Sequence, residues 1–290
     1  MLHMSITQDN KILGKPVAAT IMEQTIAHVK KIKSQTGVTP CLATVLVGED
    51  PASHTYIRMK LNRCEQAGIA SRHIKLDDDT TTQQLVTLIT ELGNDPTVNG
   101  ILLQHPVPSQ VDERAAFEAI PVSKDVDGVT YGSFSRMWFN ESGCFPSCTP
   151  QGIMLLLQSA GVQLKGKHAV VIGRSPILGK PVAGLLLAEH ATVTICHSRT
   201  EDLPSIVKLA DIVVAAVGIP EFVQGDWLKP GAIVMDAGYN PGNVGDVHFE
   251  SAQKVASLIT PVPGGVGPMT LAILMQQTAL AAAQQLGVTE

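Results

Sequence analysis

Residues 168–196 read HAVVIGRSPILGKPVAGLLLAEHATVTIC. An apolar, β-rich run ends at Gly173, a segment of helix-forming residues starts at Gly179, and a second β-rich run ends at Cys196. A strand, a helix and a strand in such close succession form a parallel βαβ unit. The tight turn between the first strand and the helix is where a Rossmann-type domain binds a dinucleotide. This stretch therefore predicts an α/β fold with a dinucleotide-binding domain.

The alternation continues on both sides of this stretch. Two further strand-centred segments follow it, at residues 209–218 and 231–238. Before it, strands and helices alternate again, over residues 41–48, 50–68, 71–76, 82–92 and 98–104. The pattern predicts two domains with a cleft between them, an N-terminal domain with a parallel βαβ sheet and a Rossmann-type dinucleotide-binding domain.

The boundary between these domains is predicted in the loop NESGCFPSCTPQG, residues 140–152. The last periodic segment, from Pro268 to Leu286, is apolar over too broad a surface for a solvated tail. We expect this helix to pack back on the first domain. The predicted domains are residues 1–147 with 270–290, and residues 148–269.

Composition narrows the function classes. The 290 residues are 44% hydrophobic and 16% charged, which excludes disorder. A formal net charge of -5 provides no basic footprint for nucleic acid or for an anionic membrane. No apolar run is long enough to span a membrane, and the first ten residues lack a signal peptide, so a cytoplasmic protein is expected.

The five cysteines are expected to be reduced thiols, because their number is odd and no Cys/His pairing typical of metal ligands surrounds them. Cys144 and Cys148 could be read as a redox or metal pair, but their spacing is not the usual two-residue gap. The nine histidines show no His-Glu-x-x-His pattern. No metal site is predicted.

The glycine turn is an imperfect cofactor fingerprint. Gly173 and Gly179 are six residues apart, whereas the usual pattern is G-x-G-x-x-G, so an ordinary strand-to-helix turn remains an alternative. Its position favours the cofactor. Ser175, Ile177 and Gly179 lead into helix amides that can bind phosphate.

The next strand favours NADP over NAD. An enzyme specific for NAD usually has an acidic residue there for the ribose 2′-hydroxyl. Residues 194–200, TICHSRT, contain Ser198 and Arg199 but no carboxylate. With Arg174, two guanidinium groups and a hydroxyl are available for a 2′-phosphate. The alternative is that Arg199 is an ordinary solvated charge.

A second stretch, DPASHTYIRMKLNRCEQAG (residues 50–68), predicts a helix capped by Asp50, begun by Pro51 and ended by Gly68. At about 100° per residue, Tyr56 and Lys60 share one arc of roughly 140° with the apolar residues. Lys60 either extends its ammonium to water or is desolvated, which lowers a lysine's pKa and suits acid/base catalysis. Tyr56 is either a core residue or a ring that contacts the substrate.

Two further polar residues are expected near the carboxyl ends of the first-domain strands, where ligands bind in parallel sheets. Gln104 ends the strand of residues 98–104, and KDVDG, residues 124–128, follows shortly after. Its second carboxylate, Asp127, precedes Gly128 in a predicted turn, where it either points toward a ligand or braces the turn.

A Tyr-x-x-x-Lys pair beside a Rossmann turn first suggests the short-chain dehydrogenases, but there the glycine turn precedes the pair. The whole chain instead resembles the bifunctional methylenetetrahydrofolate dehydrogenase/methenyltetrahydrofolate cyclohydrolase family. The blocks that carry the resemblance are YIRMK, GILLQHPVP, KDVDG, TPQGIMLLL, GRSPILGKP, CHSRT, GDV and, most specifically, PVPGGVGPMT at residues 261–270.

The resemblance implies the site residues. Lys60 is then the catalytic acid/base, Tyr56 stacks on the folate, Gln104 supports Lys60, and Asp127 binds the pterin edge. The loop formed by Pro263, Gly264 and Gly265 lies near substrate and nicotinamide. The implied cofactor is NADP, the implied substrates are tetrahydrofolate derivatives of one-carbon metabolism and purine biosynthesis, and the implied assembly is a homodimer.

The sequence departs from the family at Val129, where a larger apolar residue is common, and in the short segment 240–246. Substrate fit and loop conformation are the features that these differences affect. Two alternatives stay open: a two-domain dehydrogenase of the amino-acid type, with Lys60 as its catalytic lysine, and a folate- or nucleotide-binding protein without turnover.

Overall fold

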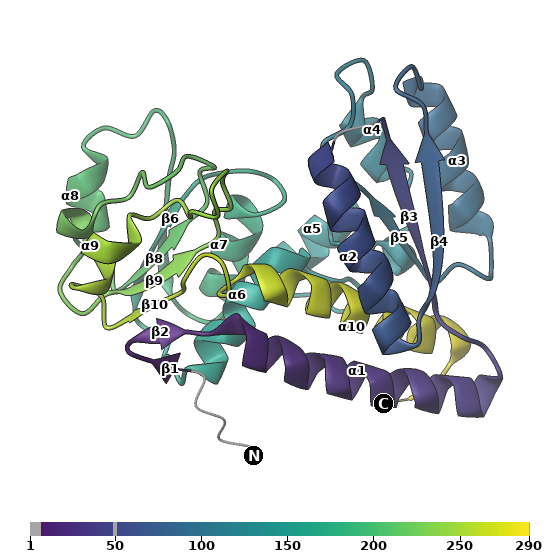
Figure 1. Cartoon of the computed structure of the whole chain (residues 1–290), viewed down its shortest axis with the longest axis horizontal. Helices are drawn as coiled ribbons and strands as arrows, with labels where there is room; N and C mark the ends of the chain where they lie inside the picture. Colours follow the sequence, from purple (N-terminus) through teal and green to yellow (C-terminus); the bar gives the residue numbers. More distant parts are fainter. Residues whose placement is uncertain (1–6, 49–50, 290) are drawn as a thin grey trace. The chain divides into compact units, whose positions relative to one another are not determined.

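The structure, a computed structural model, describes residues 7–48 and 51–289, and for residues 51–57 the backbone alone (Figure 1). The chain divides into two compact units. Met1–Thr20 and Ser147–Ile273 form one, here called the seven-stranded unit, and Ile21–Pro146 and Leu274–Glu290 form the other, the three-stranded unit. Each is described in turn.

The three-stranded unit contains a parallel sheet of order β4-β3-β5. Its central strand is almost wholly buried, as expected for a strand covered on both faces. A capping box between Thr81 and Gln84 begins α3. The elements are β3 (Cys41–Val47), α2 (Pro51–Ala67), β4 (Ala70–Leu76), α3 (Thr82–Asn94), β5 (Gly100–Leu103), α4 (Glu113–Glu118), the 3-10 helix η1 (Val122–Lys124) and α5 (Tyr131–Trp138). The predicted parallel βαβ domain is confirmed.

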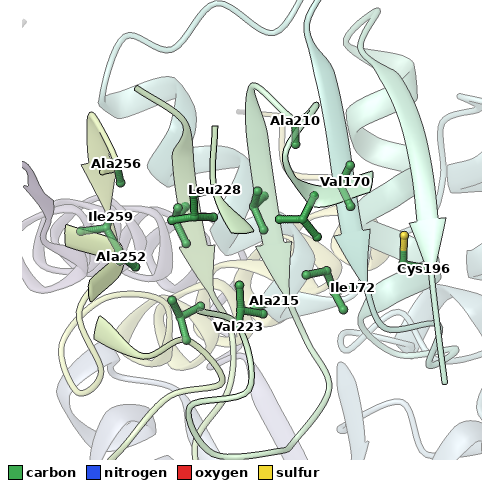
Figure 2. Packing of buried hydrophobic residues seen from close by; sticks show 14 residues of the cluster. Val170, Ile172, Cys196, Ala210, Ala215, Val223, Leu228, Ala252, Ala256 and Ile259 are labelled. Carbon is green, nitrogen blue, oxygen red and sulfur yellow. The ribbon is translucent and has the colours of Figure 1, made fainter. Parts of the chain in front are cut away.

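The seven-stranded unit has the strand order β1-β2-β10-β9-β8-β6-β7, and every pair except β1 with β2 is parallel. Its elements after the first two strands are α6 (Cys148–Ser159), β6 (His168–Ile172), α7 (Gly179–Ala188), β7 (Thr192–Cys196), α8 (Leu203–Val207), β8 (Ile212–Ala215), the 3-10 helix η2 (Gly225–Trp227), β9 (Ile233–Asp236), α9 (Phe249–Gln253) and β10 (Leu258–Ile259). Figure 2 shows Val170, Ile172 and Ala215 in the core of this sheet. The predicted Rossmann-type domain is confirmed.

One part of the predicted division is wrong. The first residues were expected in the N-terminal domain, but β1 (Thr7–Gln8) and β2 (Lys11–Ile12) extend the seven-stranded sheet. Lys11 pairs with Ile259, and the Asn10 side-chain amide donates to the carbonyls of Gln253 and Ala256. Strands of two residues are too short for an alternating pattern, so their partner is decided by these distant contacts.

Two long helices, α1 (Gly14–Thr36) and α10 (Gly267–Leu286), each contribute to both units. The C-terminal part of α10 packs on the three-stranded unit, where the Gln277 amide donates to the carbonyls of Val126 (2.7 Å) and Pro146 (3.1 Å). The division in this helix falls after Ile273, slightly later than the predicted residue 269. No helix within residues 7–48 and 51–289 is long and apolar enough to cross a membrane.

Candidate active site

Lys60 contacts Gln104 in the three-stranded unit. Its Nζ donates to the Gln104 Oε1 at 2.6 Å. Lys60 is half-buried on α2, one turn before the fully buried Cys64, whereas Arg58 and Met59 are exposed. Lys60 therefore lies on the less exposed face of α2, as its helical spacing from the apolar residues predicts. The Tyr56 side chain lies outside the described residues.

The Gln104 amide is held in one orientation. Its Nε2 donates to the His105 carbonyl at 2.7 Å, and its backbone N–H donates to the Val45 carbonyl at 2.8 Å. Because the NH₂ group is engaged on one side, the amide oxygen faces the lysine. An uncharged acceptor orients an ammonium without adding a negative charge that would favour its protonated form.

A further pair of polar side chains, which no sequence pattern indicates, lies beside Gln104. The His105 Nδ1 lies 2.6 Å from the Glu113 Oε1, and that same oxygen accepts the Val107 N–H at 3.3 Å. Glu113 is in the first turn of α4. Through these contacts, α4 holds the segment that follows Gln104. A carboxylate eight residues after the histidine has no periodic signature, so only the folded chain reveals it.

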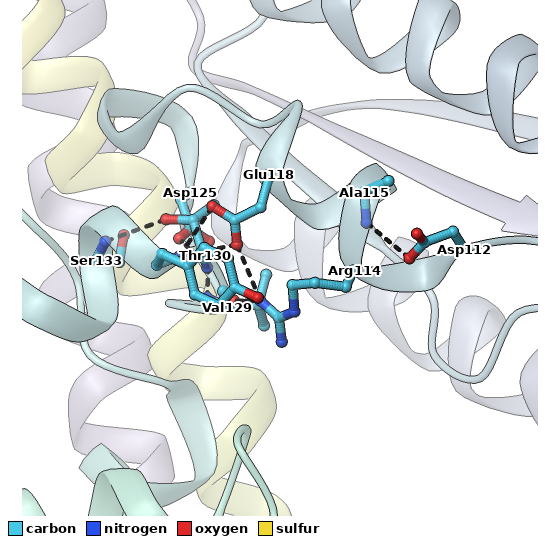
Figure 3. Close-up of polar contacts among 9 residues, drawn as sticks. Asp112, Arg114, Ala115, Glu118, Asp125, Val129, Thr130 and Ser133 are labelled. Carbon is cyan, nitrogen blue, oxygen red and sulfur yellow. Dashed lines mark hydrogen bonds and ion pairs between the residues drawn. The ribbon is translucent and has the colours of Figure 1, made fainter.

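The two carboxylates of KDVDG differ in their surroundings. Asp125 is fully buried, forms a parallel bridge with Ile101, and accepts the N–H groups of Val129 (3.1 Å) and Thr130 (2.9 Å) (Figure 3). Asp125 therefore braces the turn, while Asp127 is only half-buried. Ile101 is on β5 and its bridge with Asp125 is parallel. Asp127 and Gln104, which follow these two residues, therefore both lie toward the carboxyl end of β5.

The neighbours of this turn are fixed as well. The buried Lys124 donates from Nζ to the Asp95 carbonyl at 2.7 Å, and desolvation lowers its pKa. Val129 is 8% exposed. Its carbonyl accepts the Arg114 guanidinium at 2.7 Å (Figure 3). The small side chain is thus packed into the fold.

In the seven-stranded unit, the glycine turn is formed by contacts that exclude larger residues. Gly173 has φ +126, and a Cβ there would lie 2.1 Å from the Ala216 carbonyl oxygen. A Cβ on Gly179 would lie 2.3 Å from the Gly173 carbonyl oxygen. The six-residue spacing therefore serves a close backbone approach, the same purpose that the usual fingerprint serves.

Ser175 lies in the turn before α7. Its Oγ accepts the N–H groups of Leu178 (3.1 Å) and Gly179 (3.3 Å). These two amides at the start of the helix are thus engaged within the protein. Ile177 is half-buried in the same turn. Phosphate binding here would involve Arg174 and the preceding turn rather than the Gly179 amide.

Arg174, Ser198 and Arg199 are exposed at one edge of this sheet. Strands β6 and β7 are parallel, and the Gly173 N–H donates to the Cys196 carbonyl at 2.9 Å, so both following loops leave the same edge. The first residues of the loop after β7 carry the Ser198 hydroxyl and the Arg199 guanidinium, and the first carboxylate of this loop comes only at Glu201. This donor set, with a glycine cradle that a Cβ would fill, fits the phosphates of NADP.

The third predicted element, the loop with Pro263, Gly264 and Gly265, is also tightly packed. Gly264 has φ +109, and its carbonyl accepts the Gly14 N–H at 2.9 Å. A Cβ on Gly14 would lie 1.8 Å from the Gly265 carbonyl oxygen. The N-terminus of α1 thus supports this loop within the seven-stranded unit.

A buried carboxylate pair was missed by the sequence analysis. Asp236 ends β9, and its side chain accepts the N–H groups of Gly238, Asp246 and Val247. Burial is the largest influence on its side chain and raises the pKa of Asp236 to about 6. The one available signal was a charged residue at the end of an otherwise apolar run, VMD, at residues 234–236.

The raised pKa predicts a pH dependence of stability. Folded Asp236 binds its proton more tightly than the unfolded chain does, so the free energy of unfolding falls as pH rises from about 4 to about 6. Over this range the free energy of unfolding decreases by at most about 3 kcal/mol. Urea unfolding of the wild type and Asp236→Asn between pH 4 and 7 measures it. The variant lacks this downward slope, and equal slopes contradict the assignment.

Among the described residues no group of three or more His, Cys, Asp or Glu side chains could hold a metal ion. The five cysteines, all within the described residues, form no disulfide bond.

A half-buried lysine held by an amide, and a cationic glycine turn at the end of a Rossmann-type sheet, define a dinucleotide-dependent α/β enzyme. Residues 12–127 match the catalytic domain of tetrahydrofolate dehydrogenase/cyclohydrolase, and residues 147–286 match its NAD(P)-binding domain. The chain belongs to the tetrahydrofolate dehydrogenase/cyclohydrolase family.

Individual proteins agree with this assignment. The chain is 60% identical over 288 residues to bifunctional protein FolD 1 of Streptomyces avermitilis, covering 99% of this chain and 100% of that protein. Among solved structures, the bifunctional FolD enzyme of Campylobacter jejuni superposes with a TM-score of 0.92 at 41% identity, covering 94% and 98% of the two chains. The Trypanosoma brucei enzyme, solved with NADP and an inhibitor, gives 0.90 at 36% identity, covering 94% and 97%.

Proposed function

We propose that this protein oxidises 5,10-methylenetetrahydrofolate to 5,10-methenyltetrahydrofolate with NADP⁺ and then hydrolyses the product to 10-formyltetrahydrofolate. Both family domains are present along the chain. The observation that carries the proposal for the site is the 2.6 Å contact of Lys60 with Gln104 in the unit that contains the catalytic-domain match. The relatives' names support both activities.

When bound, NADP⁺ would supply the hydride acceptor that oxidation of the methylene bridge to the methenyl cation requires. The chain's own contribution to this step is positioning. Asp127, at the same sheet edge as Gln104, accepts N–H groups of the pterin ring, for which a carboxylate is a suitable acceptor. By its resemblance to the family we assign Tyr56, whose side chain lies outside the described residues, to folate binding.

Hydrolysis requires proton transfers that Lys60 supplies. A water molecule adds to the methenyl carbon of the cation and loses a proton to the Lys60 Nζ. The same lysine then returns that proton to the ring nitrogen whose bond to the carbon breaks, while the added hydroxyl loses its proton to solvent and becomes the formyl carbonyl of 10-formyltetrahydrofolate. Gln104 orients the amine without a charge and leaves it able to exchange protons.

The cofactor preference follows from the two exposed arginines. We expect Arg174→Gln and Arg199→Gln each to lower kcat/KM for NADP⁺ by about tenfold or more, because a charge-assisted contact to the 2′-phosphate is lost. The value for NAD⁺ should stay near that of the wild type. Arg136→Gln, at an exposed arginine of the other unit, is the control. A wild-type preference for NAD⁺ would contradict the phosphate site.

One assay tests the whole proposal. The protein is mixed with methylenetetrahydrofolate and NADP⁺, and both NADPH and the methenyl intermediate are followed over time. NADPH formation with transient methenyl compound supports the two linked reactions. Oxidation of an amino acid instead would support the amino-acid-type dehydrogenase, and thermal stabilisation by both ligands without turnover would support a binding protein. A cytoplasmic homodimer completes the proposal, and sedimentation of the purified protein tests the dimer.

A further inference from the structure

Asp246 is a fully buried carboxylate that binds two successive backbone N–H groups. Its Oδ2 accepts the Val217 N–H at 2.6 Å and the Gly218 N–H at 2.9 Å, and its Oδ1 accepts the Asn240 amide at 3.0 Å. Val217 and Gly218 form the turn that directly follows β8. A single side chain thus holds this turn from a segment 28 or 29 residues further along the chain.

That turn lies against the glycine turn of the cofactor site. The Ala216 N–H donates to the Ile172 carbonyl at 2.8 Å, and the Ala216 carbonyl is the group that a Cβ on Gly173 would meet at 2.1 Å. Any displacement of the segment held by Asp246 therefore changes the surface on which Gly173 packs. Both turns follow the carboxyl ends of adjacent strands, the edge at which open α/β sheets bind dinucleotides.

The surrounding backbone passes very close to the carboxylates of Asp236 and Asp246. Asp236 accepts the backbone N–H of Asp246 at 2.9 Å and so fixes where the Asp246 side chain starts. A Cβ on Gly238 would lie 2.2 Å from Asp246 Oδ1, and a Cβ on Gly245 would lie 1.9 Å from Asp236 Oδ2. Only glycine allows this close approach. The short segment 240–246, in which the sequence departs from the family, is what delivers Asp246 to this position.

We propose that Asp246 is a positioning residue of the dinucleotide site, which fixes the Val217–Gly218 turn beside the Gly173 turn. The inference rests on the proposed NADP-dependent reaction. If the acceptor is removed, two N–H groups lose their partner, and the turn rearranges to satisfy them elsewhere. The rearranged turn binds NADP⁺ more weakly, while Lys60 and Gln104, in the three-stranded unit, keep their contact.

The test compares Asp246→Ala and Asp246→Asn with a matched control, Asp211→Ala. Asp211 is in the same sheet and also accepts a backbone N–H, that of His168 at 3.0 Å, but it precedes β8 instead of following it. For each protein, the NADP⁺ dissociation constant is measured by calorimetry. The dehydrogenase kcat and KM, the rate of methenyltetrahydrofolate hydrolysis without NADP⁺, and Tm are measured as well.

We expect Asp246→Ala to raise the NADP⁺ Kd and KM roughly tenfold or more and to lower the ratio of dehydrogenase to cyclohydrolase kcat/KM by a similar factor. Asp246→Asn retains an acceptor oxygen and should recover most of the affinity. Asp211→Ala should leave the ratio unchanged even if Tm falls. If Asp246→Ala does not fold, Asp246→Asn alone decides. Its Kd for NADP⁺ should rise slightly, and the ratio of its dehydrogenase kcat to its cyclohydrolase kcat should equal that of the wild type.

Three results would overturn the inference. In the first, both Asp246 variants bind NADP⁺ as the wild type does. In the second, they lose both reactions in equal proportion together with Tm, which is what a purely structural role produces. In the third, Asp246→Asn is as impaired as Asp246→Ala. Failure of the proposed function looks different, because the wild type then lacks turnover while calorimetry with NADP⁺ still tests Asp246.

Discussion

Replacing Lys60 by methionine should abolish methenyltetrahydrofolate hydrolysis while a measurable dehydrogenase activity remains. Methionine keeps much of the aliphatic stem of lysine but has no group that accepts and donates protons. General acid/base catalysis contributes about 10²- to 10⁴-fold, so the hydrolysis rate should fall at least a hundredfold, toward the uncatalysed rate. The methenyl intermediate should then accumulate during oxidation, because its formation depends on positioning and on the nicotinamide rather than on a proton donor.

The measurement is hydrolysis of added methenyltetrahydrofolate, followed in parallel with NADPH formation from methylenetetrahydrofolate. Lys30→Met is the matched control, because Lys30 is an exposed lysine of α1 in the same unit. It should leave both activities unchanged. Hydrolysis by Lys60→Met at the wild-type rate would exclude the acid/base role. A fall in both reactions to the same small fraction would show that Lys60 acts in substrate binding instead.

Gly173→Ala should have the largest effect in the seven-stranded unit. At φ +126 an L-residue is strained, and the new Cβ would lie 2.1 Å from a backbone carbonyl oxygen of Ala216. That carbonyl cannot withdraw freely, because the Ala216 N–H is bonded to Ile172 at 2.8 Å. We expect a loss of about 2–4 kcal/mol in the free energy of unfolding, with at least a tenfold rise in the KM for NADP⁺.

Gly161→Ala separates the two causes. Gly161 has φ +70, and no atom lies within 4 Å of a Cβ placed there, so the variant carries backbone strain without a clash. It should lose only about 1 kcal/mol and keep its NADP⁺ affinity. Urea unfolding and dehydrogenase kinetics measure both quantities. A Gly173→Ala protein as stable and as active as Gly161→Ala would show that the close approach at Ala216 is not required.

Much of the fold was accessible from local patterns. The runs at residues 41–48, 168–172 and 209–218 are predominantly apolar, as expected for strands buried on both faces. Helical spacing placed Lys60 one turn from the buried Cys64, because residues four apart share a helix face. Gly173 was identified because a turn directly after a strand needs backbone freedom. These are short-range properties, and neighbouring residues carry them.

Pairings between distant segments required the folded chain. The sequence contained Lys60 and Gln104, 44 residues apart, but their 2.6 Å contact depends on which strand lies next to β3. Glu113 beside His105 had no local pattern to reveal it. The two carboxylates of KDVDG look alike in sequence, and only the burial of Asp125 separates the bracing residue from Asp127.

The difference between local patterns and distant contacts also explains why residues 7–20 were predicted in the wrong domain and why the role of Asp246 was not expected. Periodicity records whether a side chain is buried, and so it identified the α/β class, both sheets and the position of Lys60. It does not record which distant backbone groups a buried polar side chain must satisfy. Asp246 meets Val217 and Gly218, and Asn10 meets Gln253 and Ala256, only after strand order is established. Hydrogen bonds of buried polar groups are therefore the part of this protein that its tertiary structure specifies.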